Sequence, residues 1–334
     1  MEISLGLYPD APAHEVVHTA QLAEARGLAC VWLADSHLLW REPYVLLGAI
    51  AARSERIRLA TCVTNPLTRH PSVTAAALVT LAELSGGRAI LGISVGDSAL
   101  RAMAMPVASM DRLSRCIGTL RALIAGQGAT FARGHEARLA YAHGVPIPIA
   151  VAASGPRMLR LAGALADTVV LMNGVAPELV AAASALVDDG ARQAGRDPAA
   201  VRRVVWAACH VSDDDPRHSL AMCKYNVARA ILRNLPGVDD ARTLEIARRV
   251  RERYDYARHG SATAGFAALI PDDMVARFTF AGMAADVCAR IARLAAIGIH
   301  EVALAVPLDP DSAGRERVIE RIARCLPVGG AGCG

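Results

Sequence analysis

Leu59-Ala60-Thr61-Cys62-Val63-Thr64-Asn65-Pro66 is an apolar segment that runs into a polar turn. This pattern is typical of a buried β-strand with functional groups at its carboxyl end. Three further strand-like segments have the same design, and they end at Asp35-Ser36-His37, at Gly96-Asp97-Ser98 and at Ser154-Gly155-Pro156-Arg157. Parallel α/β proteins build their active sites from the loops at the carboxyl ends of their strands. The four junctions therefore predict a parallel α/β fold in which four loops form one site.

Apolar segments alternate with helical patterns along the chain, and this order predicts a closed (β/α)8 TIM barrel rather than an open sheet. Strands are expected near residues 3–7, 30–34, 57–62, 90–95, 149–152, 168–172, 201–211 and 302–306, with a hairpin strand at 130–131. A mostly helical stretch at residues 213–280 interrupts the alternation. We therefore expect a single barrel domain over residues 1–334, with a helical insertion at 213–280 before strand eight.

The composition agrees with one large folded domain. The 334 residues are 53% hydrophobic but only 4% aromatic, so small aliphatic side chains must fill the core. A net charge of +4 is too small and too dispersed to indicate nucleic-acid binding. The first strand begins too early for a signal peptide, and no apolar run is long enough to span a bilayer. These features predict a soluble cytoplasmic protein with a small-molecule substrate and neither a nucleic-acid nor a membrane partner.

Eight cysteines occur without a C-x-x-C pair or a zinc-like Cys/His spacing, so we expect no metal site. A reduced thiol within an apolar run behaves as a small hydrophobic side chain. Five of the cysteines lie in such runs and are expected to be reduced core thiols: Cys30, Cys62, Cys116, Cys209 and Cys288.

Two strand ends carry candidates for proton chemistry. Asp35, Ser36 and His37 follow the second strand, and Asp97 follows the fourth. A histidine exchanges a proton near neutral pH, and a carboxylate can act on a reacting centre that it faces. Asp and Ser are equally suited to cap a following helix, which is the alternative interpretation. Their position at the carboxyl end of a barrel strand favours a catalytic role over a capping role.

Two other junctions are suited to a cofactor. Thr64 and Asn65 supply compact donors and acceptors for the edge of a heteroaromatic ring. Residues 154–158 open a helix, and free N–H groups at a helix start bind anions such as phosphate, although a plain capped helix is the alternative. The Walker, G-x-G-x-x-G, H-E-x-x-H and G-x-S-x-G motifs are absent. Nucleotide hydrolases, Rossmann dehydrogenases, zincins and serine hydrolases are therefore unsupported.

The junctions resemble those of the bacterial luciferase-like superfamily, in particular its deazaflavin branch related to methylenetetrahydromethanopterin reductase. The resemblance rests on Cys62-Val63-Thr64-Asn65-Pro66, Arg69-His70-Pro71, Ala82-Glu83-Leu84-Ser85-Gly86-Gly87-Arg88, Gly96-Asp97-Ser98 and Ala152-Ala153-Ser154-Gly155-Pro156-Arg157-Met158. It implies coenzyme F420 as the cofactor, with FMN as the alternative, and a non-prolyl cis peptide at Cys62-Val63. The expected cofactor contacts are Cys62, Val63, Thr64, Asn65, Val95, Gly96, Ser154, Gly155, Arg157 and Met158.

The resemblance predicts a coenzyme F420-dependent oxidoreductase that moves a hydride between the deazaflavin and a small organic substrate. An FMN-dependent luciferase-like monooxygenase and a non-catalytic cofactor-binding homologue are the alternatives. Asp97 stands where relatives hold a catalytic carboxylate. In contrast, Ser36 stands where some relatives carry a histidine, and Gly6 stands where the methanopterin reductases carry a glutamate. Both departures weaken the inference that this chain catalyses the reaction of those relatives.

Two roles stay open for the insertion at 213–280. It is a lid over the reactive end of the cofactor, with Tyr254, Tyr256 and His259 as substrate contacts, or it is a contact in a homodimer or higher homo-oligomer. Its arginine-rich part, residues 248–258, is expected to form a solvated helix face, with contact to an anionic ligand as the alternative.

Overall fold

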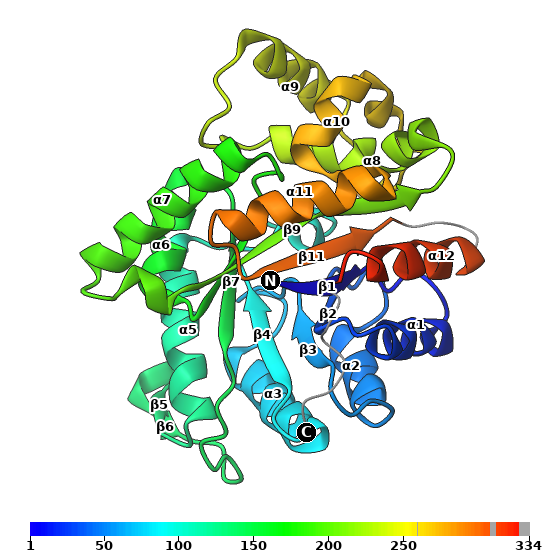
Figure 1. Cartoon of the computed structure of the whole chain (residues 1–334). Coiled ribbons are helices and arrows are strands. Elements are labelled where there is room, and N and C mark those ends of the chain that lie inside the picture. The colour runs from blue at the N-terminus through cyan, green and yellow to red at the C-terminus, as the bar shows by residue number, and fades with distance from the viewer. Residues whose placement is uncertain (259, 308–311, 327–334) are drawn as a thin grey trace.

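Parallel strands close into a barrel in the computed structural model, which describes residues 1–258, 260–307 and 312–326 (Figure 1). Around the ring the strands follow chain order: β1 (Glu2–Leu7), β2 (Cys30–Leu33), β3 (Arg58–Thr61), β4 (Ala89–Ile93), β7 (Ile149–Ala153), β8 (Thr168–Leu171), β9 (Arg202–Ser212) and β11 (Glu301–Val306). β11 pairs with both β9 and β1, and β8 pairs with β9, so the ring is complete. The predicted (β/α)8 barrel is confirmed.

Helices surround the barrel and follow most of its strands (Figure 1). They are α1 (Ala13–Ala25), α2 (Pro43–Ala51), α3 (Pro71–Ser85), α5 (Met110–Ile124), α6 (Pro156–Leu165), α7 (Pro177–Gln193), α11 (Ala284–Ala296) and α12 (Ser312–Ala323), and the four-residue α4 (Ser98–Arg101) follows β4. Proline supplies the first helical residue of α2, α3, α6 and α7, where its missing N–H costs nothing. Within the described residues, no helix is long and apolar enough to cross a bilayer.

The segment between β9 and β11 is mostly helical, as predicted, but it also contains a strand. α8 (Pro216–Ile231), α9 (Ala241–Arg253) and α10 (Asp272–Phe278) form a group at the top of Figure 1. β10 (Phe280–Met283) then pairs in parallel with the second half of the eleven-residue β9. Four residues are too few to show a periodic pattern, and only the extension of β9 beyond its pairing with β11 gives β10 a partner. β5 (Ala129–Thr130) and β6 (Glu136–Ala137) form the small hairpin that was expected.

Small side chains and two tryptophans fill the barrel interior. The inward positions include Cys30, Ala60, Ala150, Ala152, Ala208, Ala303 and Ala305, together with Trp32 and Trp206. At the amino-terminal end, Trp32 Nε1 donates to Glu301 Oε1 at 2.9 Å. Arg58 and Arg202 pair with the other oxygen of Glu301 at 3.2 and 3.1 Å. Glu301 is 1% exposed, so this end of the barrel is closed by a buried, fully partnered carboxylate.

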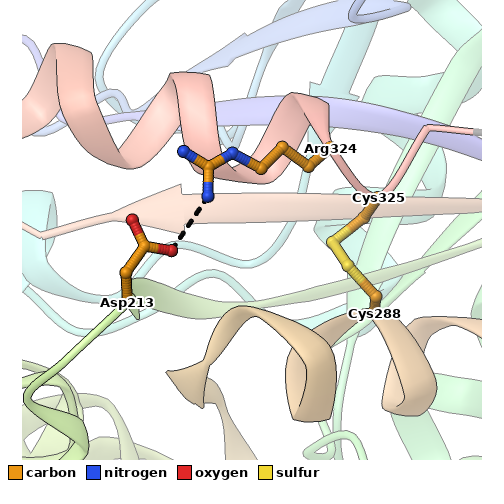
Figure 2. Close-up of a disulfide and its surroundings, with 4 residues drawn as sticks. All are labelled: Asp213, Cys288, Arg324 and Cys325. Atoms are coloured by element: carbon orange, nitrogen blue, oxygen red, sulfur yellow. Dashed lines mark hydrogen bonds and ion pairs between the residues drawn. A yellow bond between two sulfur atoms is a disulfide. The ribbon is translucent and has the colours of Figure 1, made fainter.

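A disulfide joins Cys288 on α11 to Cys325, just beyond α12 (Figure 2). The prediction that Cys288 is a reduced core thiol is therefore wrong. The two cysteines are 37 residues apart, without a motif spacing, and only the packing of α11 and α12 on the barrel brings them together. Beside them Arg324 Nη1 pairs with Asp213 Oδ1 at 2.9 Å, so the end of α12 is fixed at two points (Figure 2). The other predicted core thiols are free and buried: Cys30, Cys62, Cys116 and Cys209.

Replacing the buried carboxylate with Glu301→Gln is expected to destabilise the barrel by about 3 kcal/mol at pH 7, because Arg58 and Arg202 lose a buried partner. Burial alone raises the pKa of Glu301, but Arg58 and the hydrogen bonds outweigh it and hold the pKa below its ordinary value. This stability is therefore present above the unfolded-state pKa of about 4.3 and is lost as the pH falls through the folded-state value. Urea unfolding at pH 7 and pH 3.5 measures both effects.

The matched control is Glu320→Gln, which removes an exposed ion pair with Arg26 and should cost less than about 1 kcal/mol. Equal losses in the two variants, or a Glu301→Gln loss that does not shrink at low pH, would contradict the assignment of the stabilisation to the buried carboxylate.

Candidate active site

A cavity of about 300 Å³ opens at the carboxyl ends of the barrel strands. Its walls come from the segments that follow β1, β2, β3, β4, β7 and β8, from the inward face of β9, and from the end of α8. The four polar junctions of the sequence therefore meet at one place. The site predictions that line the cavity are Asp35, Ser36, Cys62, Val63, Asn65, Val95, Gly96, Asp97, Ser154 and Met158.

Four predicted site residues are not among the cavity-lining residues. The side chain of His37 is exposed to solvent, and Arg157 is exposed as well. Thr64 is fully buried in the wall behind the cavity. Gly155 lies at the start of α6, where backbone groups rather than a side chain are offered to a ligand.

The end of β2 holds a buried ion pair. Asp35, whose side chain is 1% exposed, accepts a hydrogen bond from Arg69 Nη1 at its Oδ2, 2.6 Å away. The other oxygen, Oδ1, is buried and has no hydrogen-bond partner in the described part of the chain. Next along the chain, Ser36 Oγ lies 2.6 Å from Ser98 Oγ and so connects this strand end to the start of α4. Asp35 and Ser36 thus both contribute to the cavity wall, and Ser36 is fixed through Ser98.

Asp97, after β4, is clamped by two arginines. It accepts hydrogen bonds from Arg101 Nε at 2.9 Å and from Arg233 Nη2 at 2.8 Å. The preceding Gly96 has φ +88°, and a Cβ there would lie 2.5 Å from Leu100 Cδ1, so glycine is required. These two charge-assisted hydrogen bonds join the loop after β4 to the segment after α8.

The end of β3 contributes Cys62, Val63 and Asn65 to the cavity wall. The peptide between Cys62 and Val63 is cis, as the resemblance implies. Cys62 N donates to Leu33 O at 2.6 Å, and Thr64 N donates to Gly92 O at 2.9 Å. The cis peptide is therefore held between β2 and β4, with Cys62 and Val63 on the cavity wall.

The start of α6 is suited to an anion. Gly155 is the N-cap residue of this ten-residue helix, and it has no side chain that could accept a hydrogen bond from the first turn. The loop before it is fixed from both sides, because Ser94 Oγ donates to Ala152 O at 2.8 Å and Asn173 Nδ2 donates to Ser154 O at 2.7 Å. Unsatisfied N–H groups and the positive end of the helix dipole favour a phosphate here.

Several cavity-lining residues were not predicted: Tyr8, Trp40, Met172, Trp206, Arg229 and Arg233. The aromatic residues carry no motif, and only the barrel brings them to the site. Arg229 does have a local signal, because it interrupts the apolar stretch Val227-Ala228-Arg229-Ala230-Ile231. A cation in an otherwise buried stretch of helix indicates a polar cavity or a buried partner.

Trp206 explains the glycine in β1. A Cβ added to Gly6 would lie 2.6 Å from Trp206 Cη2 and 2.9 Å from the Cα of Ala305. The indole therefore occupies the space that a side chain at position 6 would need. The glutamate that the resemblance places at this position in methanopterin reductases does not fit beside Trp206.

The barrel and the cavity at its carboxyl end fit one class of protein: the chain belongs to the luciferase-like monooxygenase family, whose model matches residues 1–301. It is 31% identical over 337 residues to 5,10-methylenetetrahydromethanopterin reductase of Methanolobus tindarius, covering 97% of this chain and 99% of the relative. It is 33% identical over 201 residues to F420-dependent glucose-6-phosphate dehydrogenase of Nakamurella multipartita, covering 54% of this chain and 59% of the relative.

Among solved structures, the coenzyme F420 dependent tetrahydromethanopterin reductase from Methanopyrus kandleri superposes with a TM-score of 0.78 and 25% identity, covering 97% of this chain and 98% of that one. The predicted family, with relatives that are F420-dependent oxidoreductases, is confirmed.

Gly6→Ala is expected to lower the free energy of unfolding by about 1–3 kcal/mol, because the added methyl group overpacks the barrel against Trp206 and Ala305. The loss should shrink in a Trp206→Phe background, because the smaller ring removes one of the two collisions. Gly48→Ala in α2 is the control: its Cβ meets nothing within 4 Å, so it should be neutral or stabilising. If Gly6→Ala unfolds like Gly48→Ala in urea, the close packing of Trp206 on Gly6 is refuted.

Proposed function

We propose that this protein is a coenzyme F420-dependent oxidoreductase that moves a hydride between the deazaflavin and a small organic substrate. The observation that carries the proposal is one cavity that combines a mostly apolar wall, with Cys62, Val63 and Met172, with a helix start after Ser154 that has no capping side chain. An aromatic ring fits the first feature, and a phosphate fits the second. The relatives that match nearly the whole chain support the same conclusion.

The residues present fit this cofactor. Cys62 and Val63 back the ring, and Asn65 and the buried Oδ1 of Asp35 offer polar groups to its edge. The N–H groups of residues 155–158 hold the phosphate. When bound, the cofactor supplies the carbon that accepts or releases the hydride.

The protein's own part in the reaction is orientation, exclusion of water and control of charge. Ser36, hydrogen-bonded to Ser98, offers a hydroxyl at the cavity wall beside Asp35. Asp97, held by Arg101 and Arg233, places a carboxylate and two guanidinium groups at the loop that follows β4. Of the four catalytic candidates, the proposal retains Asp35, Ser36 and Asp97. It leaves out His37, because His37 is exposed and is not among the residues that line the cavity.

Titration of the purified protein with F420 and with FMN, followed by quenching of cofactor fluorescence, tests the choice of cofactor. We expect F420 to bind at least tenfold more tightly, because the family members that match most of the chain include F420-dependent enzymes. Tighter FMN binding would favour the flavin monooxygenase alternative. Tight F420 binding without oxidation of reduced F420 by any of a broad panel of carbonyl, imine and alkene compounds would favour a non-catalytic homologue.

Gly155→Asp is expected to separate cofactor affinity from stability. The carboxylate caps α6 and stabilises the fold by a few tenths to about 1 kcal/mol, but it also occupies the N–H donors and repels a phosphate. F420 affinity should therefore fall at least tenfold while the thermal midpoint stays level or rises. The control is Gly155→Ala, whose Cβ would meet only Asn234 O at 3.7 Å. Wild-type F420 affinity in Gly155→Asp would remove the α6 start from the site.

We further propose one barrel domain over residues 1–334 with the stretch 213–280 as an inserted lid. Two contacts support the lid: Arg233 pairs with Asp97, and Arg101 stacks on the ring of Tyr256 at 4.9 Å. Tyr254 packs on Phe266 within the insertion at 4.4 Å between centroids. Both tyrosines lie outside the cavity wall, and His259 lies outside the described residues. The arginines of α9 are exposed, as in a solvated helix face.

We also propose a cytoplasmic homo-oligomer. Large apolar side chains are exposed on the adjacent helices α2 and α3, with Val45 72%, Val73 56% and Leu84 59% exposed. Burying such residues against a second copy is favourable. These three residues lie on helices other than those of the insertion, although Leu244 on α9 is also 52% exposed.

Limited proteolysis is expected to distinguish the two roles of the insertion. Protection of cleavage sites in α8–α10 should appear on addition of F420 and should not change with protein concentration, because the lid contacts the cavity loops. Protection that follows protein concentration without F420 would instead identify the insertion as an assembly surface.

A further inference from the structure

The cavity carries more positive than negative charge. Arg101, Arg229 and Arg233 line it together with Asp35 and Asp97. Asp35 is already paired with an arginine that does not line the cavity. Asp97 is shared between Arg101 and Arg233. Arg229 is left with no ion pair in the described part of the chain, and the cavity has a net demand for an anion.

Two guanidinium nitrogens in this wall lack acceptors. Arg229 Nε and Arg233 Nη1 are buried and have no hydrogen-bond partner among the described residues. A buried N–H of a charged group is unfavourable unless an acceptor reaches it. The negative end of the helix dipole favours the charge of Arg229 in the last turn of α8. The dipole does not, however, supply hydrogen-bond acceptors for the two nitrogens. The two arginines are four positions apart, so their forks are neighbours and can hold one ligand.

The ionisable neighbours of Arg229, other than Asp97, cannot neutralise it. Burial raises the pKa of Tyr8, of Tyr225 and of the Cys62 thiol, and Arg229 lowers each of them by less than burial raises it. Burial likewise raises the pKa of Tyr254. All four groups are therefore uncharged near neutral pH, and the charge of Arg229 remains uncompensated on their side.

We propose that Arg229 and Arg233 bind an oxyanion of the substrate, a carboxylate or a phosphate group. The proposal rests on the proposed function, because it names the substrate class of the same cavity. A planar guanidinium fork matches either group through two parallel hydrogen bonds. Trp40, Trp206 and Val63 give the cavity apolar walls. The substrate is therefore a small organic anion with an apolar body.

The position of Arg229 separates this oxyanion from the phosphate of the cofactor. Asn234, which follows Arg233, is the neighbour of Gly155 at the start of α6. Arg229 lies one helical turn away from that end, and its charge acts on Tyr8 and Cys62, at the ends of β1 and β3. The phosphate of the cofactor and the oxyanion of the substrate thus occupy opposite ends of the arginine pair.

Isothermal titration calorimetry with three probes of similar size tests the proposal in the wild-type protein, with and without bound F420. The probes are benzoate, phenyl phosphate and neutral benzamide. We expect at least one of the two anions to bind at least tenfold more tightly than benzamide and to weaken as salt is raised. The anion should bind alongside F420 without displacing it. If the wild-type protein bound the anions and benzamide with equal affinity, this result alone would overturn the proposal.

Arg229→Met keeps the apolar stem and removes the fork, so it should weaken binding of the preferred anion at least tenfold and leave F420 affinity within twofold. Arg229→Lys keeps the charge but loses the planar fork, so its affinity for the anion should lie between those of the wild type and Arg229→Met. Arg217→Met is the control, because it removes a charge from an exposed position of the same helix and should leave all affinities unchanged. Thermal unfolding verifies that each variant is folded.

The arms of the experiment also separate this proposal from the proposed function. If Arg229→Met lowers F420 affinity by the same factor as anion affinity, and the anions displace F420, the arginines serve the cofactor and the proposal is overturned. If F420 fails to bind while the anion binds through Arg229, the oxyanion site stands and the proposed function fails. Unchanged anion affinity in folded Arg229→Met overturns the oxyanion site alone.

Discussion

Six consecutive residue pairs hold β1 against β11, from Glu2 beside Glu301 to Leu7 beside Val306. These strands lie at opposite ends of the chain, and their pairing converts a curved sheet into a closed barrel. Closure has two consequences. It buries Glu301 at the amino-terminal end among Trp32, Arg58 and Arg202, where a carboxylate is stable only with partners. It also gathers the opposite strand ends around one cavity.

The shape of the cavity also depends on side-chain contacts between loops that follow different strands. Asp97 is the point where these contacts meet, because it binds Arg101 in its own loop and Arg233 beyond α8. The insertion is therefore attached to the site through charge, and Arg101 adds a stacking contact with Tyr256. If the insertion is the proposed lid, a ligand that binds these arginines would change how the insertion is held.

The cavity has two sides that differ in their residues. Cys62, Val63 and the start of α6 form the proposed cofactor side. On the other side, Trp206 occupies the volume beside Gly6, and Arg229 Nε has no hydrogen-bond partner among the described residues. The proposed substrate therefore meets residues other than those proposed to hold the cofactor. Such a division allows one barrel to serve different substrates.

Local patterns were enough to predict the eight barrel strands, most helices and the four polar junctions, because barrel strands and helix starts have short-range signatures in hydrophobicity, glycine and proline. Asp35, Asp97 and Ser154, which these patterns singled out, line the cavity. The sequence marked Arg229 only as a cation in an apolar stretch, and it could not indicate which cavity Arg229 lines, that Cys288 bonds to Cys325, or that His37 is exposed. Each of these depends on contacts between segments far apart in the chain, or on the direction of one side chain in a loop. Only barrel closure and the docking of α8, α11 and α12 set those distances, so the tertiary structure alone decided them.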